Sequence, residues 1–184
     1  MTAIVGIKMK IRKATQNDAD AIRSVHLAAF PEGERDLISD VAVAMLFEEA
    51  SPPVLSLVAE VDDTIIGHVT FSPVTSRDTK EHLGYILAPL AVSPGHQKRG
   101  IASQLIKSGV ERLSELGSGV LLVYGDPDFY SRFGFCADRG ECYTPPYQLE
   151  YAFGWQAMAL GDFDFPSSAI SISCVSSLRN AALW

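Results

Sequence analysis

The segment Leu90–Ala102 constrains the fold more than any other part of the chain. An apolar run with strand character ends at Ser93-Pro94, and a short loop with two glycines and two cations follows it. From Ile101 onward the apolar residues recur with helical spacing. A strand that passes into a helix through such a loop leaves several backbone N–H groups pointing one way, at the positive end of the helix dipole. The segment therefore predicts a phosphate or pyrophosphate site, to which Lys98 and Arg99 add positive charge.

The residues on either side of this segment predict a βαβ unit. We expect a strand over His82–Val92, a helix over Ile101–Leu116 and a short apolar strand over Val120–Tyr124, joined by a right-handed crossover. Pro89 lies near the middle of the first strand and cannot donate a hydrogen bond to a neighbouring strand. We therefore expect a bulge or a free edge at Pro89. Either one leaves a wedge in the sheet, where unpaired backbone groups can bind an extended ligand.

The rest of the chain divides into shorter elements with ordinary start and stop signals. Thr15 and Asp18 have the spacing of a capping box, so a helix begins near Asp18. From Asp138 onward the strand pattern is weak. In chain order we expect these segments: a strand over Lys8–Ala14, helices ending at Phe30 and running over about Arg35–Glu49, a hairpin of strands over Val54–Val61 and Thr64–Phe71, a loop over Ser72–Glu81, a helical turn over Phe129–Phe133, a strand from Phe135, and strands over Gln156–Leu160 and Ala169–Val175.

Charge, hydropathy and cysteine content narrow the class of protein. The net charge of −7 argues against a nucleic-acid partner, because phosphate backbones require a basic face. We expect no membrane span, since no stretch approaches the ~20 consecutive apolar residues that a bilayer requires. The three cysteines have no C-x-x-C spacing, which favours reduced thiols in a cytoplasmic protein over a disulfide framework or a metal site.

Three blocks of sequence carry a family resemblance: Ile65–Phe71, Leu90–Ala102 and Tyr124–Phe135. Together they resemble the GNAT superfamily of acyl-CoA-dependent N-acetyltransferases, and Gln97–Ala102 is similar to its acetyl-CoA signature, Q/R-x-x-G-x-G/A. The Gly-Asp-Pro spelling that follows Tyr124 looks like a bacterial branch of predicted acetyltransferases with mostly undefined substrates. The resemblance implies an α/β, single-domain GNAT fold over residues 1–184. Its mixed, mostly antiparallel central sheet would carry a β-bulge wedge and helices on both faces, with a core over 9–136 and acceptor-side strands and loops over 137–184.

The resemblance also implies residue roles, with acetyl-CoA as co-substrate. Tyr130 occupies the position of the tyrosine that protonates the departing CoA thiolate. A phenol with a pKa near ~10 stays protonated at neutral pH and can donate to a thiolate whose acid has a pKa of ~8.5. The CoA pyrophosphate would be held by the backbone amides of Gln97, Lys98, Arg99, Gly100, Ile101 and Ala102. The pantetheine arm would pair with backbone groups of the strand, at Leu90, Ala91 and Val92.

The implied reaction is direct attack of an unprotonated primary amine on the thioester. An amine is mostly protonated near pH 7, so a base or a water chain is expected. The candidates that the sequence leaves open are Glu32, Glu34, His68, Glu81 and His82, among which we prefer Glu34 and His68. The acceptor can be a small-molecule amine or a peptide. Dimers are frequent in this family, and the sequence does not decide whether this chain forms a homodimer.

Two other functions compete with this interpretation. A P-loop nucleotide-binding protein shares the G-x-x-x-x-G spacing of Gly95–Gly100, but Ile101-Ala102 stands where Lys and Ser or Thr are required. The P-loop hypothesis therefore fails. A CoA-binding GNAT-fold module without catalysis, acting as a sensor or interaction module, would keep the loop and need not keep Tyr130. The presence of Tyr130 favours an enzyme.

Overall fold

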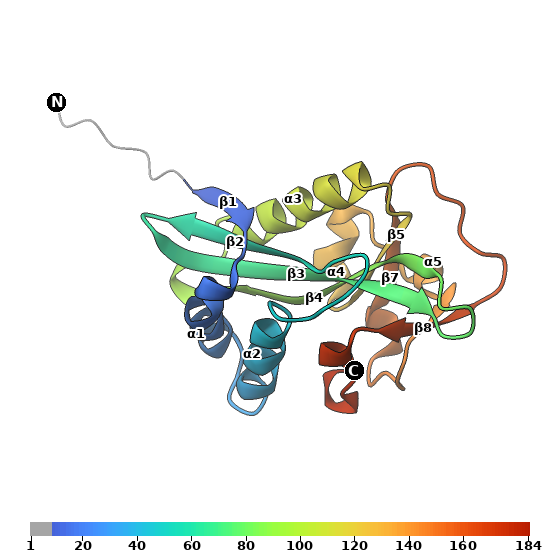
Figure 1. The fold of residues 1–184 in the computed structure, drawn as a ribbon, viewed down its shortest axis with the longest axis horizontal. Coiled ribbons are helices and arrows are strands. Elements are labelled where there is room, and N and C mark those ends of the chain that lie inside the picture. Colours follow the sequence, from blue (N-terminus) through green and yellow to red (C-terminus); the bar gives the residue numbers. More distant parts are fainter. Residues whose placement is uncertain (1–8) are drawn as a thin grey trace.

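The strands form one mixed sheet with helices on both faces, in a computed structural model that describes residues 9–184 (Figure 1). Neighbouring strands are antiparallel, except that β4–β5 and β6–β8 are parallel. The strand order is β1-β2-β3-β4-β5-β7, and β8 pairs with both β3 and β6. The bounds are β1 Lys10–Lys13, β2 Leu55–Val61, β3 Thr64–Ser76, β4 His82–Val92, β5 Val120–Tyr124, β6 Tyr143–Thr144, β7 Trp155–Ala159 and β8 Ile170–Cys174. Lys8, the first residue of the strand expected at the N-terminus, lies outside the described residues.

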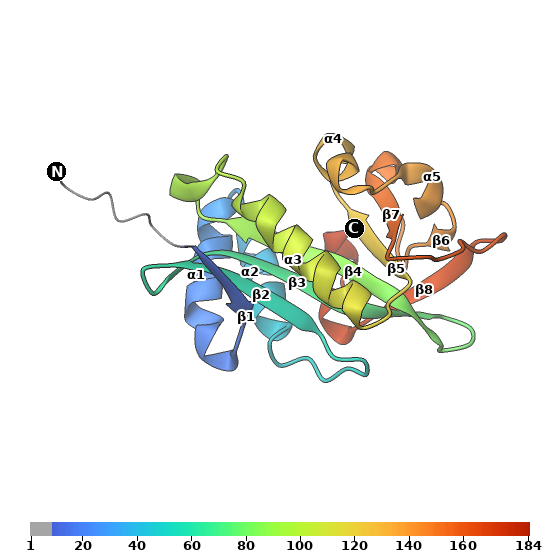
Figure 2. The same ribbon diagram turned by 90° about the horizontal axis from the view of Figure 1, so that it is seen from above.

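The helices divide between the two faces of the sheet. Helix α3 (Ile101–Glu115) packs on β2, β3 and β4 and lies diagonally across the strands (Figure 2). Helices α1 (Ala19–Ala29) and α2 (Arg35–Ala44) cover the opposite face (Figure 1). The C-terminal segment, with 3₁₀ turns over Ser176–Leu178 and Ala181–Leu183, lies beside α2 on that same face. Among residues 9–184, none of the helices is long and apolar enough to cross a bilayer.

Alternation along the strands builds a separate apolar layer on each face. Tyr85 and Leu87 of β4 join Leu105 of α3 in the larger core cluster. Ile86, between them in sequence, belongs to the cluster on the other face together with Val41 of α2. Because successive strand residues point to opposite faces, a central strand with both faces covered must be apolar at nearly every position.

A bulge in β4 interrupts the sheet at Pro89. Phe71 of β3 pairs with Leu87, and Val69 pairs with Leu90, so that two β4 residues oppose one β3 residue. Leu87 and Leu90 are therefore on the same face although they are three residues apart. The parallel pairing of β4 with β5 ends at Leu87 and Val123. The wedge expected from Pro89 is confirmed.

Three predicted boundaries differ from the structure. Strand β3 extends through part of the expected loop, to Ser76, because Val74 is fully buried and pairs with both β4 and β8. Helix α2 ends at Ala44, and the next turn is closed by bonds between residues three apart, from Leu46 N–H to the Val43 carbonyl among them. A short helix, α4 (Pro127–Tyr130), and a 3₁₀ turn over Ser131–Phe133 occupy the expected helical turn.

The C-terminal third follows the prediction in its strands but not at Phe135. The strands expected over Gln156–Leu160 and Ala169–Val175 are confirmed as β7 and β8. The strand expected from Phe135 is wrong. Cys136 forms a single bridge to Ala157, and a short helix, α5 (Ala137–Gly140), begins at once.

Gly109 allows α3 to approach the sheet closely, and its substitution by Ala is expected to destabilise the protein. A Cβ at Gly109 would lie 2.1 Å from Cζ of Phe71, a ring that is fully buried and cannot move aside. We expect Gly109→Ala to lower the free energy of unfolding by about 1–3 kcal/mol despite the better helix propensity of Ala. Urea unfolding measures this change. Gly95→Ala, where a Cβ meets nothing within 4 Å, is the control, and equal midpoints for the two variants would contradict the account.

Candidate active site

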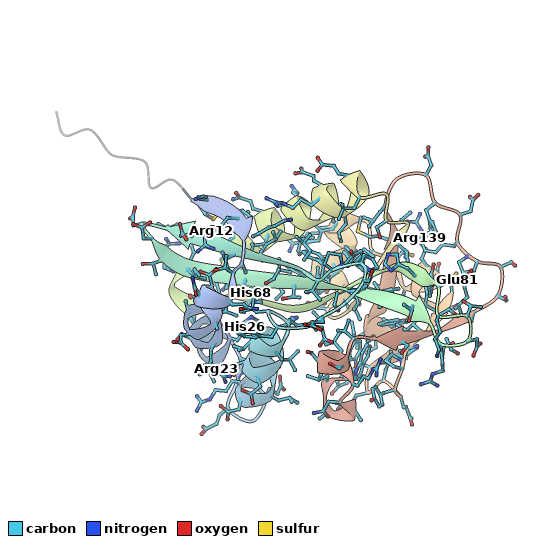
Figure 3. The ribbon with its side chains drawn as sticks, viewed as in Figure 1. Arg12, Arg23, His26, His68, Glu81 and Arg139 are labelled. Carbon is cyan, nitrogen blue, oxygen red and sulfur yellow. The ribbon has the colours of Figure 1, made fainter. Side chains whose placement is uncertain are left out.

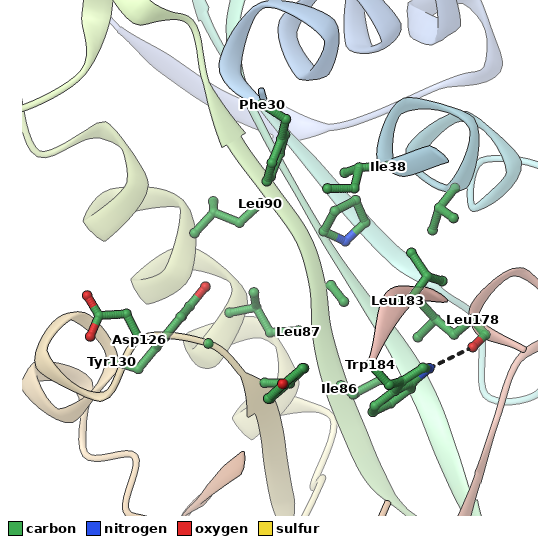
Figure 4. Close-up of a pocket in the computed structure, with 15 residues that line it drawn as sticks. Phe30, Ile38, Ile86, Leu87, Leu90, Asp126, Tyr130, Leu178, Leu183 and Trp184 are labelled. Atoms are coloured by element: carbon green, nitrogen blue, oxygen red, sulfur yellow. Dashed lines mark hydrogen bonds between the residues drawn. The ribbon is translucent and has the colours of Figure 1, made fainter. Parts of the chain in front are cut away.

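Two cavities meet at Leu90, on the edge of β4 that β5 leaves unpaired. The first, of about 580 Å³, lies between the loop after β4 and helix α4, and we call it the loop cavity. The second, of about 350 Å³, lies between the end of α1, α2, β4 and the C-terminal segment, and we call it the apolar cavity (Figure 4). A ligand that follows the edge of β4 passes from the loop cavity into the apolar cavity.

The loop cavity gathers nearly all the residues that the sequence assigned to cofactor binding. Arg99 is the exception, since it is exposed and is not part of the lining. The structure adds residues that the sequence analysis did not select, among them His96, Phe129 and Arg132. The predicted residues that line it are Leu90, Ala91, Val92, Gln97, Lys98, Gly100, Ile101 and Ala102.

The backbone of the loop is held in place by its own side chains and by the sheet. The Gln97 side-chain amide donates to the Val92 carbonyl over 3.0 Å, which ties the loop back to the strand. The Ser93 N–H donates to the Ile66 carbonyl of β3 over 2.8 Å. Gly100, with φ of 78°, is the N-cap of α3 and has no side chain to cap the first turn. The amides of that turn therefore remain available to an anion at the positive end of the helix dipole.

Arg132 adds a second cation to the loop cavity from the opposite wall. Its guanidinium lies over the Phe129 ring, 4.6 Å from the centroid, and both residues line the cavity that Lys98 lines from the loop. Its Nε donates to the Phe129 carbonyl over 3.1 Å, which leaves the two terminal amino groups of the guanidinium as donors to a phosphate. Its position two residues after Tyr130 is the sequence signal that could have identified it.

The apolar cavity brings together residues that are far apart in sequence. Phe30 and Ile38 reach it from the end of α1 and from α2, and Leu183 and Trp184 form the facing wall (Figure 4). Tyr130 enters from α4, with its hydroxyl directed toward Leu87 and Leu90 on β4 (Figure 4). Its phenolic O–H therefore lies where the two cavities join.

The position of Tyr130 depends on Gly125. A Cβ at residue 125 would lie 2.5 Å from the Tyr130 ring, so only glycine lets the ring pack on this turn. The ring also makes edge contacts with Phe129 and Phe135, at centroid distances of 4.9 and 5.6 Å. Burial, together with the negative charge of Asp126, raises the pKa of Tyr130 above its usual value of 10. The hydroxyl therefore stays protonated and able to donate at neutral and moderately alkaline pH.

A third, outer cavity of about 510 Å³ shares Asp126 and Trp184 with the apolar cavity and opens to solvent. Glu34 and Glu150 line it, and both side chains are exposed. Of the two preferred bases, Glu34 is thus the one at the entrance to the site. Glu32 lies in the same loop and approaches Arg35 at 3.9 Å.

His68 does not line either of the two joined cavities. It is fully buried under α1, where its Nδ1 shares a 2.8 Å hydrogen bond with Nε2 of His26 and its Nε2 shares one of 2.8 Å with the Ser56 hydroxyl. The cleft position expected for His68 is therefore wrong. Its side chain points to the face of the sheet that α1 covers, so His68 is not a candidate for the base. Glu81 and His82 lie at the start of β4, whereas the loop cavity lies at the other end of that strand (Figure 3). No group of His, Cys, Asp and Glu side chains in residues 9–184 is placed to hold a metal ion.

A family model and two related sequences point to the same family of proteins. The family model described as acetyltransferase (GNAT) family matches residues 19–135. The uncharacterized N-acetyltransferase YjhQ of Escherichia coli strain K12 is 34% identical over 151 residues, which cover 79% of this chain and 81% of YjhQ. The uncharacterized N-acetyltransferase YhbS of the same strain is 36% identical over 132 residues, or 71% of this chain and 66% of YhbS.

Solved structures resemble the fold along nearly its whole length. The crystal structure of E. coli YhbS in complex with CoA has a TM-score of 0.83 at 26% identity, covering 98% of this chain and 97% of that one. A GNAT family acetyltransferase from Brucella melitensis in complex with acetyl-CoA has a TM-score of 0.68 at 31% identity, covering 89% and 94%.

The buried pair of His26 and His68 predicts a loss of stability in acid. Burial lowers the pKa of His26 from 6.5 to about 4. Burial also lowers the pKa of His68, and the nearby His26 lowers it further. The unfolded chain then binds more protons than the folded one. The stability that comes from keeping His26 neutral is therefore fully present above pH 6.5 and is lost as the pH falls toward about 4. We expect a fall of about 3 kcal/mol from His26 alone.

Urea unfolding at a series of pH values measures this fall. His26→Gln should remove His26's share of it, so that this variant loses less stability than the wild type between pH 6.5 and about 4. A pH dependence of stability that is the same in the wild type and His26→Gln would contradict the assignment.

Proposed function

The chain belongs to the acetyltransferase (GNAT) family, and on that premise we propose how its residues transfer an acetyl group from acetyl-CoA to a primary amine. One observation carries the proposal: the loop cavity and the apolar cavity join at Leu90, beside the Tyr130 hydroxyl. A site for a phosphorylated carrier then leads directly to a site for an acceptor, with a proton donor between them.

The loop cavity is suited to the phosphate end of acetyl-CoA. The amides at the start of α3 and the charges of Lys98 and Arg132 would bind the pyrophosphate, and the unpaired edge over Leu90–Val92 would hold the pantetheine arm. The YhbS structure contains CoA and the Brucella structure contains acetyl-CoA, which supports the same co-substrate for this chain. Acetyl-CoA supplies the activated acetyl group.

Tyr130 acts as the general acid in this mechanism. The amine nitrogen forms a bond to the thioester carbonyl carbon, the carbon–sulfur bond breaks, and the Tyr130 O–H gives its proton to the departing thiolate. The nitrogen loses one proton as the amide forms, and that proton returns through water to the Tyr130 oxygen. The raised pKa of Tyr130 keeps that proton in place until the thiolate forms. The ammonium must lose a proton before attack. We assign that step to Glu34, acting through water from the entrance of the outer cavity, where it is exposed.

We also propose that residues 1–184 act as a single acetyltransferase domain in which 137–184 form the acceptor side. Leu178, Leu183 and Trp184 in the wall of the apolar cavity support this division. No observation favours a CoA-binding module without catalysis over the enzyme. The cytoplasmic location and the homodimer stay predictions.

Binding and turnover test the proposal in sequence. Calorimetric titration with acetyl-CoA should show binding at one site, and an assay for free thiol should then show CoA release that depends on an added amine. Absence of binding would overturn the assignment of the loop cavity. Binding without turnover over a broad panel of amines and peptides would instead favour the non-catalytic module.

Tyr130→Phe should reduce kcat by about 10²-fold or more, because the thiolate loses its proton donor. The dissociation constant of CoA should change little, since the Tyr130 hydroxyl lies away from the phosphate end of the loop cavity. The pH dependence of the rate is the second readout: the wild type should keep its advantage over Tyr130→Phe at alkaline pH, because the phenol pKa is raised. Equal rates across the pH range would remove Tyr130 from the acid role.

Arg132→Ala should weaken CoA binding by about 10-fold, the usual size of a lost charge-assisted contact at a partly exposed site. Arg139→Ala is the matched control, because Arg139 also stacks on an aromatic ring, Phe165, at 5.4 Å, but is not part of the loop-cavity lining. Calorimetry with CoA measures both variants. If the two variants bind CoA equally well, Arg132 does not contact it.

A further inference from the structure

We propose that the acceptor is a small primary amine carried on a compact apolar group, with no carboxylate of its own. This inference rests on the proposed function, because it assigns an occupant to the apolar cavity that acetyl transfer requires. It follows from three features of the site: the chemistry of the inner wall, the way that wall is fixed, and the charge at the entrance.

The inner wall is apolar on both sides of the space beside Tyr130. Phe30 and Ile38 form one side, and Leu178, Leu183 and Trp184 form the other (Figure 4). An acceptor whose nitrogen reaches the Leu90 junction must place its neighbouring atoms against these side chains. An apolar group gains free energy there from burial, whereas a polar group loses its hydration without finding a hydrogen-bond partner.

The C-terminal half of this wall is fixed by specific bonds. Trp184 Nε1 donates to the Leu178 carbonyl over 3.1 Å, and its ring packs 5.9 Å from the Trp155 ring. The turn before it is tied to the loop after α2, where the Glu48 carboxylate accepts hydrogen bonds from the hydroxyls of Ser177 and Ser176 and from their backbone N–H groups. Burial alone raises the pKa of Glu48, but these bonds outweigh it and hold that pKa below its usual value. The wall is therefore preformed.

The entrance is negatively charged. Glu34, Asp126 and Glu150 line the outer cavity, and no Lys or Arg from residues 9–184 lines either that cavity or the apolar cavity. The field of these carboxylates attracts an ammonium group and repels an anion. A carboxylate next to the reacting amine would enter the apolar cavity with no cation to pair with, at a large cost in desolvation.

The size of the cavity argues for a compact acceptor. Its 350 Å³ must hold the acetyl end of the co-substrate as well as the acceptor. An alkyl diamine offers these walls less apolar surface to bury than an aralkyl or branched alkyl group does. The apolar walls thus favour an aralkyl or branched alkyl monoamine over an alkyl diamine, and the lack of a cation disfavours a free amino acid.

A matched panel of amines tests this inference with the wild-type protein. The free-thiol assay would compare 2-phenylethylamine, phenylalanine amide, phenylalanine and 1,4-diaminobutane. We expect kcat/KM for 2-phenylethylamine to exceed that for 1,4-diaminobutane by about 10-fold or more, the usual effect of filling an apolar pocket. Phenylalanine should be at least about 10²-fold poorer than its amide, because only the free acid carries a carboxylate.

Variants of the wall and the entrance identify the cause of the preference. Trp184→Ala should lower kcat/KM for 2-phenylethylamine about 10-fold through KM, and Trp184→Phe should restore most of it. Phe47→Ala, at an exposed aromatic that does not line the cavity, should change neither kcat/KM nor KM for 2-phenylethylamine. Glu150→Gln should narrow the gap between phenylalanine and its amide.

The outcomes separate this inference from the function on which it rests. If 1,4-diaminobutane or phenylalanine is acetylated as well as 2-phenylethylamine, the inference is wrong and acetyl transfer stands. If acetyl-CoA binds but no amine releases thiol, the proposed function fails and the inference falls with it. A 2-phenylethylamine preference that Trp184→Ala leaves unchanged would also overturn the inference.

Discussion

The bulge at Ala88-Pro89 is the constraint on which the site depends. Two residues of β4 there oppose one residue of β3, so Leu87 and Leu90 are on the same face and both border the apolar cavity. The pairing of β4 with β5 ends at Leu87, and the strand edge beyond it becomes available to a ligand. An unbroken ladder would close this edge and separate the loop cavity from the apolar cavity. A single irregularity in the sheet thus creates the path along which the reaction proceeds.

Positive and negative charges lie at opposite ends of this path. The chain is acidic overall, yet the loop cavity has Lys98, Arg132 and the positive end of the α3 dipole, while the outer cavity has Glu34, Asp126 and Glu150. An anionic carrier and a cationic acceptor are therefore attracted to opposite ends, with the apolar cavity between them. Low polarity there helps Tyr130 keep its proton, since a phenolate would be poorly solvated.

Local patterns predicted the part of the site that depends on chain-adjacent residues. The bounds of β4, the start of α3 and the bulge at Pro89 follow from alternation, loop composition and the chemistry of proline, and the structure has them where the sequence placed them. The acceptor wall could not be found this way. Trp184 meets Phe30 and Ile38 only through tertiary packing, and no periodicity connects a 3₁₀ turn at one end of the chain with helices at the other. His68 illustrates the same limit, because a strand pattern gives its face but not whether α1 covers it.

The most direct test of the central claim is a crystal structure of the protein with CoA. We predict that the pyrophosphate lies on the backbone of Gln97–Ala102, that the pantetheine arm follows the β4 edge over Leu90–Val92, and that the sulfur comes within hydrogen-bond distance of the Tyr130 hydroxyl. A CoA sulfur that ends away from Tyr130, or a carrier bound outside the wedge between β4 and β5, would contradict the account.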